Sequence, residues 1–127
     1  MKSRGDAEAW YNKGYALFER GEISEAIKAL NVALGINPGD TKSWILVGNA
    51  SMEMEDYETA LKAYDEVLKK VQTDADIWVS KGNALFNLGR TEEALSAFQH
   101  ALNIEPDHYY AEYCMNIAHE LVTSPSP

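Results

Sequence analysis

The sequence predicts an all-α protein: an α-α superhelix (solenoid) of three helix-turn-helix repeats with a terminal solvating helix. The main observation is a constant interval of 34 residues between Trp10, Trp44 and Trp78. The same shift superposes glycines and alanines, at Gly14, Gly48, Gly82, Ala16, Ala50, Ala84, Ala26, Ala60 and Ala94. An internal period of about 20–50 residues indicates a solenoid or repeat array.

Within each 34-residue unit, the pattern predicts two short helices joined by a turn. In the first unit, Trp10 and Gly14 share one face of a helix predicted over residues 7–19. Gly21 takes the left-handed conformation at low energy, so this helix ends there. A second helix is predicted over residues 24–35, with an apolar face toward the first.

An aspartate precedes each predicted first helix, at Asp6, Asp40 and Asp74. Each is predicted to cap its helix, because a carboxylate accepts hydrogen bonds from the free N–H groups of the first turn. Replacing one of them should destabilise the protein by about 1 kcal/mol.

Small residues on both helices predict a close helix crossing. We expect the glycine of the first helix to meet the alanine of the second, while Leu30, Tyr64 and Phe98 close over the ends. An added methyl group at Gly48 would overpack this crossing, by roughly 1–3 kcal/mol.

This unit resembles the tetratricopeptide repeat: a Trp, a Gly four residues later, a central Ala, and an aromatic residue or Leu four residues beyond it. The resemblance implies a single domain over residues 7–122, with ranges as follows: repeats 7–40, 41–74 and 75–108, capping helix 109–122, flexible ends 1–6 and 123–127. Repeat two departs from the pattern at Ser51, Glu55 and Gln72, where the other repeats carry Leu, Gly and Pro. These changes are expected to weaken its turn and the junction into repeat three.

The last helix is predicted to close the stack. Where the repeats carry Trp, Gly and Leu, it carries Glu112, Asn116 and His119, so its outer face is polar as a terminal element requires. The stripe predicted to pack on the preceding helix is Ala111, Met115, Ala118 and Val122. Few residues precede the first repeat, so that end is expected to expose apolar surface or to meet another chain.

Composition excludes several classes of partner. The net charge is −9 with 11 scattered basic residues, which disfavours nucleic acid and anionic membranes as partners. The sequence contains neither a long apolar run nor a signal peptide, so a cytoplasmic location is expected. The single cysteine, Cys114, forms no internal disulfide and is expected to serve as a small hydrophobe.

The resemblance implies that the first helices line a concave groove that holds a peptide. We call the residues two before and one, five and nine after each Trp the groove positions. Glu19 also stands at one of these offsets but is not taken as a candidate. With two tyrosines of the last helix, the candidate binding residues are Glu8, Tyr11, Tyr15, Lys42, Ile45, Asn49, Glu53, Asp76, Val79, Asn83, Asn87, Tyr110 and Tyr113.

Asn49 and Asn83 are the sharpest candidates, because a side-chain amide both donates to and accepts from a peptide backbone. The alternative is that both only solvate a helix face. Tyrosines supply stiff contact area with a polar end. The alternative of core packing weighs more for Tyr15 than for Tyr11.

The chaperone-binding branch of this family clamps a carboxylate with Lys, Asn and Arg. At the matching positions this sequence carries Tyr11, Tyr15, Leu46, Asp76 and Ser80. With further acidic residues nearby, the groove suits a neutral or basic peptide and not an acidic C-terminal tail.

Two functions remain open. The chain is either a peptide-binding module or a self-assembly module that uses its first repeat or its groove to form a homo-oligomer. A metal-dependent enzyme is disfavoured. His108 and Glu112 are four residues apart, but His108 is expected to cap the last helix and a full ligand set is lacking. We therefore expect no catalytic residue, metal or cofactor.

Overall fold

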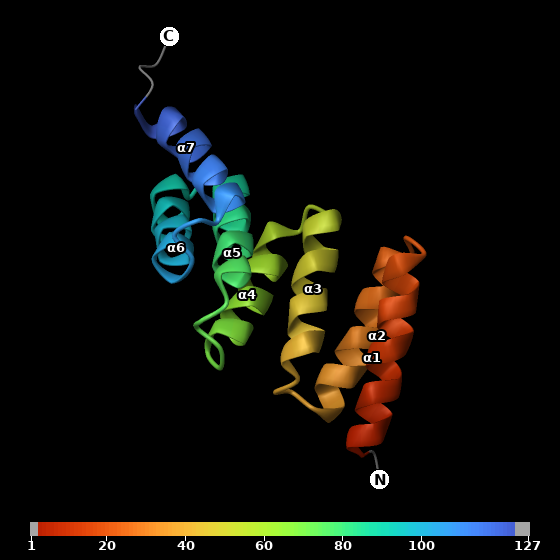
Figure 1. The fold of residues 1–127 in the computed structure, drawn as a ribbon. Helices are drawn as coiled ribbons and strands as arrows, with labels where there is room; N and C mark the ends of the chain where they lie inside the picture. The colour runs from red at the N-terminus through yellow and green to blue at the C-terminus, as the bar shows by residue number, and fades with distance from the viewer. Residues whose placement is uncertain (1–2, 124–127) are drawn as a thin grey trace. The chain divides into compact units, whose positions relative to one another are not determined.

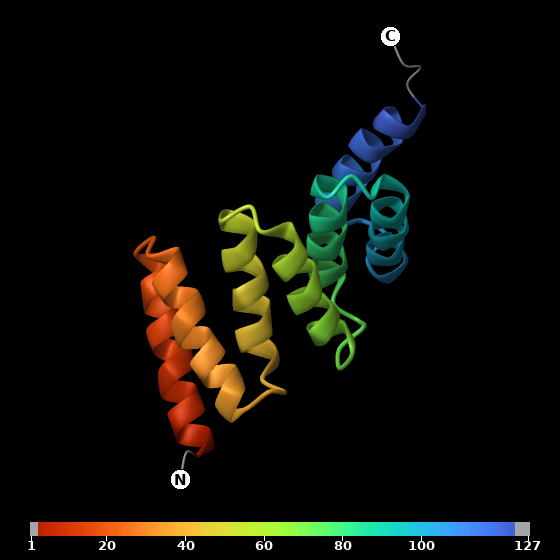
Figure 2. The same ribbon diagram turned by 180° about the vertical axis from the view of Figure 1, so that it is seen from behind.

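The computed structural model describes residues 3–123, and this part of the chain contains seven α-helices and no β-strand. The helices are α1 (Arg4–Glu19), α2 (Ile23–Ile36), α3 (Thr41–Glu53), α4 (Tyr57–Leu68), α5 (Ala75–Asn87), α6 (Thr91–Ile104) and α7 (Tyr109–Thr123). Figures 1 and 2 show α1 with α2, α3 with α4 and α5 with α6 as helix pairs joined by short turns. The predicted all-α repeat fold is confirmed.

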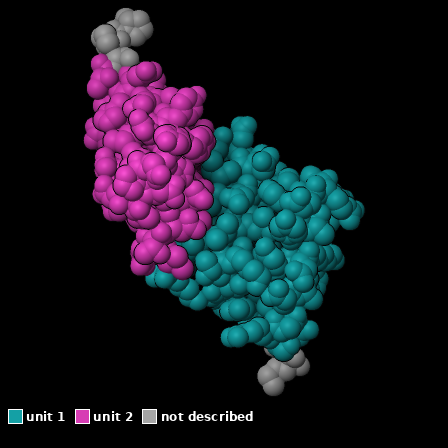
Figure 3. Space-filling model, viewed as in Figure 1, with its two compact units in different colours: residues 1–70 teal, residues 71–127 magenta. Residues whose placement is uncertain are grey.

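The chain divides into two compact units, residues 1–70 and residues 71–127 (Figure 3). In unit 1, α1 packs against α2, α2 against α3 and α3 against α4, and α1 also touches α3. In unit 2, α6 packs on both α5 and α7, and α5 also touches α7. A single domain over residues 7–122 stays a prediction.

Each repeat glycine lies against the large side chain of the second helix. A Cβ atom at Gly48 would lie 2.5–2.9 Å from three atoms of the Tyr64 ring, and one at Gly82 would overlap the Phe98 ring. Both rings are only 1% exposed. At Gly14 a Cβ atom would also lie 3.3 Å from the Ala26 carbonyl oxygen, so the predicted approach of small residues holds there. The prediction that Leu30 and the two rings only close over the helix ends is wrong, because they lie on the glycines themselves. The helices approach because a large side chain lies directly on bare backbone.

The first helix begins at Arg4, three residues earlier than predicted. Its N-cap residue is Ser3, whose backbone N–H donates to the Asp6 carboxylate at 2.9 Å. Asp6 thus lies inside the first turn, so its predicted role as N-cap is wrong. Residues 4–6 and Thr123, which we assigned to flexible ends, are helical. The remaining parts of those ends, 1–2 and 124–127, lie outside the described residues.

Asp40 and Asp74 directly precede α3 and α5, but only Asp74 caps its helix through the side chain. The Asp74 carboxylate accepts from the N–H of Asp76 at 3.0 Å. The Asp40 carboxylate makes no such bond and accepts instead from the hydroxyl of Ser43, which is fully buried. The predicted cap at Asp40 is wrong because the Ser43 hydroxyl, one turn into the helix, binds the carboxylate instead.

The turn of repeat two keeps the shape of the other two turns without a glycine. Gly21 and Gly89 have φ of +80° and +81°, and Glu55 has φ of +59° at the same position. The N–H of Asp56 donates to the carbonyl of Ser51 at 2.8 Å, which closes the end of α3. The left-handed region costs a residue with a side chain roughly 1–2 kcal/mol. The expected weakening of this turn is therefore a backbone strain at Glu55.

Two tryptophans form hydrogen bonds to the backbone of the segment that precedes their own helices. Trp44 Nε1 donates to the carbonyl of Pro38 at 2.8 Å, and Trp78 Nε1 donates to the carbonyl of Gln72 at 3.0 Å. Pro38 and Gln72 are equivalent positions 34 residues apart. Since the acceptor is a backbone carbonyl, the exchange of Pro for Gln preserves this bond at the junction into repeat three.

Helix α7 packs on the rest of unit 2 through small side chains. Ala111 and Ala118 are fully buried and Cys114 is 9% exposed. The predicted packing stripe is thus right for the two alanines and wrong for Val122, which is 45% exposed. The polar outer face is confirmed, with exposed side chains at Glu112, Asn116 and His119.

Large exposed apolar side chains gather on α7 and not on the first repeat. In residues 3–123, Tyr15 is the one such residue of α1 and α2. Helix α7 has six, namely Tyr109, Tyr110, Tyr113, Ile117, Leu121 and Val122. Among the described residues, the amino-terminal helices therefore expose fewer large apolar side chains than α7 does. The alternative, that this end meets another chain, stays a prediction.

Candidate functional site

In unit 1, the groove positions of α1 carry two tyrosines in different environments. Tyr11 is half-buried and packs against a core cluster that includes Leu46, and burial raises the pKa of its phenol. Tyr15 is 48% exposed, and the two ring centres are 6.3 Å apart. The alternative of core packing is therefore wrong for Tyr15 and partly right for Tyr11.

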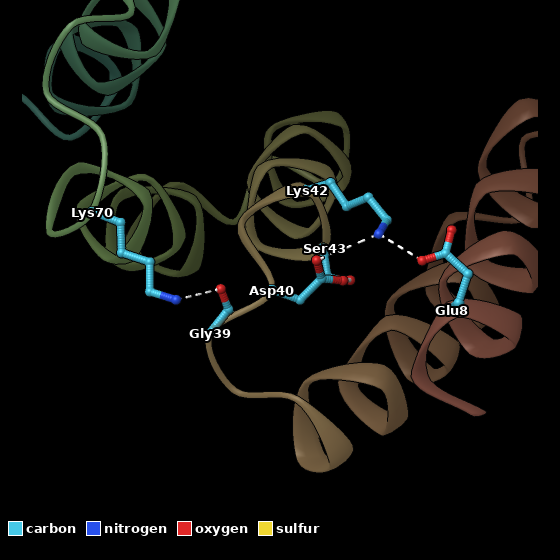
Figure 4. A network of polar contacts seen from close by, with 6 residues as sticks. All are labelled: Glu8, Gly39, Asp40, Lys42, Ser43 and Lys70. Atoms are coloured by element: carbon cyan, nitrogen blue, oxygen red, sulfur yellow. Dashed lines mark hydrogen bonds and ion pairs between the residues drawn. The ribbon is translucent and has the colours of Figure 1, made fainter. Parts of the chain in front are cut away.

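The ammonium group of Lys42 on α3 lies between two carboxylates (Figure 4). Its Nζ lies 2.8 Å from a Glu8 oxygen and 3.6 Å from an Asp40 oxygen. It also lies 5.0 Å from the centre of the Tyr11 ring, where the negative ring face attracts a cation. The hydrogen bond with Glu8 raises the pKa of Lys42. The positive charge at this groove position is therefore already neutralised within the protein.

A second lysine of the same network binds backbone. Lys70, just after α4, donates to the carbonyl of Gly39 at 2.8 Å, as Figure 4 shows. Gly39 precedes Asp40, so the chain segment before α3 is tied to both α4 and α1. This network positions the groove residue Lys42.

Asn49 is exposed on α3, and its orientation is fixed from the second helix of the repeat. Its Oδ1 accepts a hydrogen bond from the Tyr64 hydroxyl at 2.7 Å. The Nδ2 group is thus the end of the amide that can donate to a ligand. The other groove positions of α3 beside it are Ile45, half-buried, and Glu53, exposed.

In unit 2, the equivalent Asn83 on α5 is oriented differently. Its Nδ2 donates to the hydroxyl of Tyr110 on α7 at 3.3 Å, and its backbone carbonyl accepts from Asn87 Nδ2 at 2.8 Å. Repeat three carries Phe98 where repeat two carries Tyr64, so the equivalent ring has no hydroxyl to donate to this amide. The protein thus holds Asn83 by its Nδ2, whereas it holds Asn49 by its Oδ1.

A pocket of about 160 Å³ lies between α5 and α7 in unit 2. The side chains that line it come from three helices: Asn83, Phe86, Phe98, Tyr110, Tyr113, Cys114 and Ile117. The rings of Tyr110 and Tyr113 have centres 6.4 Å apart, and burial raises the pKa of the Tyr110 phenol and of the Cys114 thiol. Two of the predicted groove tyrosines and one predicted asparagine thus meet at one apolar hollow.

His108 joins the starts of α5 and α7. Its Nε2 lies 2.7 Å from an Asp76 carboxylate oxygen, and its Nδ1 accepts from the N–H of Ala111 at 3.1 Å. The predicted role of His108 in place of a capping Asp is confirmed. The hydrogen bond with Asp76 raises the pKa of His108. Its predicted alternative partner Glu112 is linked to it through backbone only.

The predicted groove residues include one that is buried and leave out two exposed apolar residues of α7. Val79 is 3% exposed, so its side chain lies in the core and not on the surface. Ile117 and Leu121 are 36% and 62% exposed. They stand five and nine residues after Glu112, which occupies the Trp position of α7. Counting the same offsets along the last helix would have found them.

Among the residues that the structure describes, no three His, Cys, Asp or Glu side chains gather in a way that could hold a metal ion. Within residues 3–123, no helix is both long and apolar enough to cross a membrane. A cytoplasmic location stays a prediction.

Two family models, both described as tetratricopeptide repeat, match the chain over residues 7–40 and 48–109. No curated protein sequence matches it.

Solved structures match over nearly the whole chain. The first tetratricopeptide repeat domain of Spaghetti (RPAP3), bound to the HSP90 peptide SRMEEVD, is 19% identical with a TM-score of 0.89, covering 96% of this chain and 97% of that chain. The OM64 domain from Arabidopsis is 19% identical with a TM-score of 0.86, covering 93% and 98%. A MamA RS-1 double mutant is 20% identical with a TM-score of 0.90, covering 94% and 67%. At these identities the likeness concerns the fold.

Proposed function

Because the chain belongs to the tetratricopeptide repeat family, whose members are generally non-catalytic protein–protein interaction modules, we propose that it binds a neutral or basic peptide segment of a protein partner. The peptide contacts the groove positions of the first helices. In unit 1 these lie on α1 and α3, and in unit 2 on α5, together with the exposed face of α7.

The observation that carries this proposal is the pairing of Lys42. It is the one basic residue among the predicted groove residues, and two carboxylates within 4 Å offset its charge. Glu53 and Asp76 add exposed negative charge at other groove positions. An acidic peptide would meet repulsion there, whereas Lys and Arg side chains of a ligand would be attracted.

The positions of the carboxylate clamp support the same choice. Tyr11 and Tyr15 offer phenols in place of a cation and an amide. Leu46 has an aliphatic side chain that is only 6% exposed, so this position offers no polar side-chain atom to a ligand. The HSP90 peptide of the Spaghetti domain, SRMEEVD, is acidic at its end. We expect this chain not to bind that peptide.

The two asparagines offer opposite ends of their amides. Asn49 presents Nδ2 to a peptide carbonyl and Asn83 presents Oδ1 to a peptide N–H. Each such bond contributes about 0.5–1.5 kcal/mol net. Main-chain contacts of this kind hold a peptide irrespective of its side chains, and selectivity then comes from charge and apolar contacts.

A pull-down with the purified chain tests the proposal. A variant with Tyr11→Ala plus Asn49→Ala should lose the partner, and a control with Glu58→Ala plus Lys62→Ala, both exposed on α4, should retain it. The captured segment is then synthesised as a peptide, and its affinity for the chain is compared with that of SRMEEVD. Equal capture by both variants, or tight binding of SRMEEVD, would contradict the proposal.

Self-association is the second candidate, favoured by the exposed apolar side chains on α7. Sequence reasoning placed this contact at the first repeat or in the groove, and the surface now favours the last helix. Light scattering over a range of concentrations tests it, because a homo-oligomer dissociates on dilution. A constant monomer mass at every concentration would exclude this candidate.

A further inference from the structure

The pocket between α5 and α7 has the size of a side-chain site. Its volume is about 160 Å³, whereas sites for drug-sized molecules hold about 300–1,000 Å³. No charged side chain lines it, and its polar atoms are the amide of Asn83, two phenol hydroxyls and the Cys114 thiol. Burial raises the pKa of that thiol, so a neutral group faces the pocket at physiological pH. The occupant that fits these walls is uncharged and apolar.

Unit 2, which contains the pocket, is acidic as a whole. Residues 71–127 contain eight Asp and Glu against two Lys and Arg. Arg90 is paired with Glu93 at 2.7 Å, and Lys81 lies 5.5 Å over the Trp78 ring, so neither lines the pocket. Glu112 lies beside Tyr113, the two lining a neighbouring hollow. This negative field attracts cationic groups over about 8 Å at physiological ionic strength.

We propose that this pocket takes one bulky apolar side chain, such as Leu or Met, from a peptide that carries Lys or Arg on both sides of it. The inference rests on the proposed function and adds the identity of the anchor. The apolar side chain is buried against Phe86, Phe98 and Ile117, while Asn83 Oδ1 accepts a backbone N–H beside the anchor. The flanking cations meet the carboxylates of unit 2.

Three labelled heptapeptides test the anchor by fluorescence anisotropy: KKALAKK, KKAAAKK and EEALAEE. KKALAKK should bind about tenfold more tightly than KKAAAKK, because the leucine side chain buries three more carbon atoms than alanine does. EEALAEE should show no binding at the same concentrations. Two results overturn the inference. One is equal affinity for the Leu and Ala peptides, and the other is no binding of KKALAKK at up to roughly 1 mM peptide, the Kd of a weak complex.

Cys114 provides a second readout that reports on the pocket itself. It is the one cysteine of the chain, and it lines the pocket. Saturating KKALAKK should slow its alkylation by iodoacetamide at mildly alkaline pH, followed by intact mass. KKAAAKK at equal occupancy should protect it less. Equal protection by both peptides would place the Leu side chain elsewhere.

Two variants on one face of α7 separate the pocket from the rest of the helix. Ile117→Asp puts a charge into the lining, whereas Leu121→Asp changes a more exposed residue of the same face outside the lining. Circular dichroism checks that both fold. Ile117→Asp should abolish the preference for Leu over Ala, and Leu121→Asp should keep it. Equal effects of the two changes contradict the pocket.

The outcomes also separate this inference from the proposed function. If both basic peptides bind equally and Tyr11→Ala plus Asn49→Ala weakens both, the groove stands and the anchor is wrong. If EEALAEE binds best, the charge argument fails for both. If Ile117→Asp instead abolishes self-association of the chain, the occupant is a second copy, and the peptide anchor is overturned.

Discussion

The hydroxyl of Tyr64 donates to Oδ1 of Asn49 at 2.7 Å and links the second helix of repeat two to a groove position on its first helix. Repeat three replaces this tyrosine with Phe98, and its asparagine bonds to Tyr110 of α7. The side chain at this core position thus distinguishes which end of the surface amide the protein holds.

Tyr64→Phe should therefore lower the free energy of unfolding by about 0.5–1.5 kcal/mol, the net value of one hydrogen bond. The ring itself is retained, and Phe98 shows that the position accepts it. Urea unfolding measures the stability. Peptide affinity should fall as far as it does in Asn49→Ala, because the amide loses its fixed orientation; unchanged affinity in Tyr64→Phe would contradict that reason.

Gly48→Ala should destabilise the protein by roughly 1–3 kcal/mol, because the new methyl group meets a ring that is packed on all sides. Gly35→Ala is the matched control. It also lies in a helix, α2, and a Cβ there has no heavy atom within 4 Å. The control should raise stability by up to about 1 kcal/mol, since alanine favours helix over glycine. Thermal or urea unfolding of the two variants should thus give opposite signs.

Glu55→Gly should stabilise the protein by about 1 kcal/mol, because glycine takes a positive φ without strain. Gly21→Ala, at the equivalent turn of repeat one, should destabilise by a similar amount, although its surroundings are open. Urea unfolding compares both with the parent chain. A stabilising Gly21→Ala would show that backbone strain does not control these turns.

The contact between His108 and Asp76 predicts a pH dependence. The Asp76 carboxylate raises the pKa of His108 above its ordinary value of 6.5. A raised pKa in the folded state means that the stabilisation is fully present below pH 6.5 and is lost as the pH rises through the folded pKa. An NMR titration should show this raised value.

In Asp76→Asn the pKa of His108 should fall to 6.5 or below, because the Ala111 N–H that binds Nδ1 favours the neutral ring. A variant that lacks the other two histidines, His100→Gln plus His119→Gln, identifies the NMR signal of His108. The fall in stability above pH 6.5 should disappear in the same variant. An unchanged His108 pKa in Asp76→Asn would assign the shift to another group.

Periodicity predicted the helices well because one 34-residue pattern repeats three times, and each copy supports the interpretation of the others. It predicted the helix starts less well. An aspartate at a repeated position caps only where no nearer donor binds it, and Ser43 is such a donor at Asp40. Val79 shows the same limit, since an offset from Trp gives a helix face and not its burial.

The sequence by itself determined the repeat, its register and the position of its last helix, because these follow from residue types at fixed intervals. It also determined the acidic balance, on which the expectation against nucleic acid and anionic membranes depends. Only the tertiary structure decided which groups are already satisfied: Lys42 by Glu8 and Asp40, and the Oδ1 atom of Asn49 by Tyr64. Pairing and pocket formation depend on distances between helices far apart in the sequence, and no local pattern contains those distances.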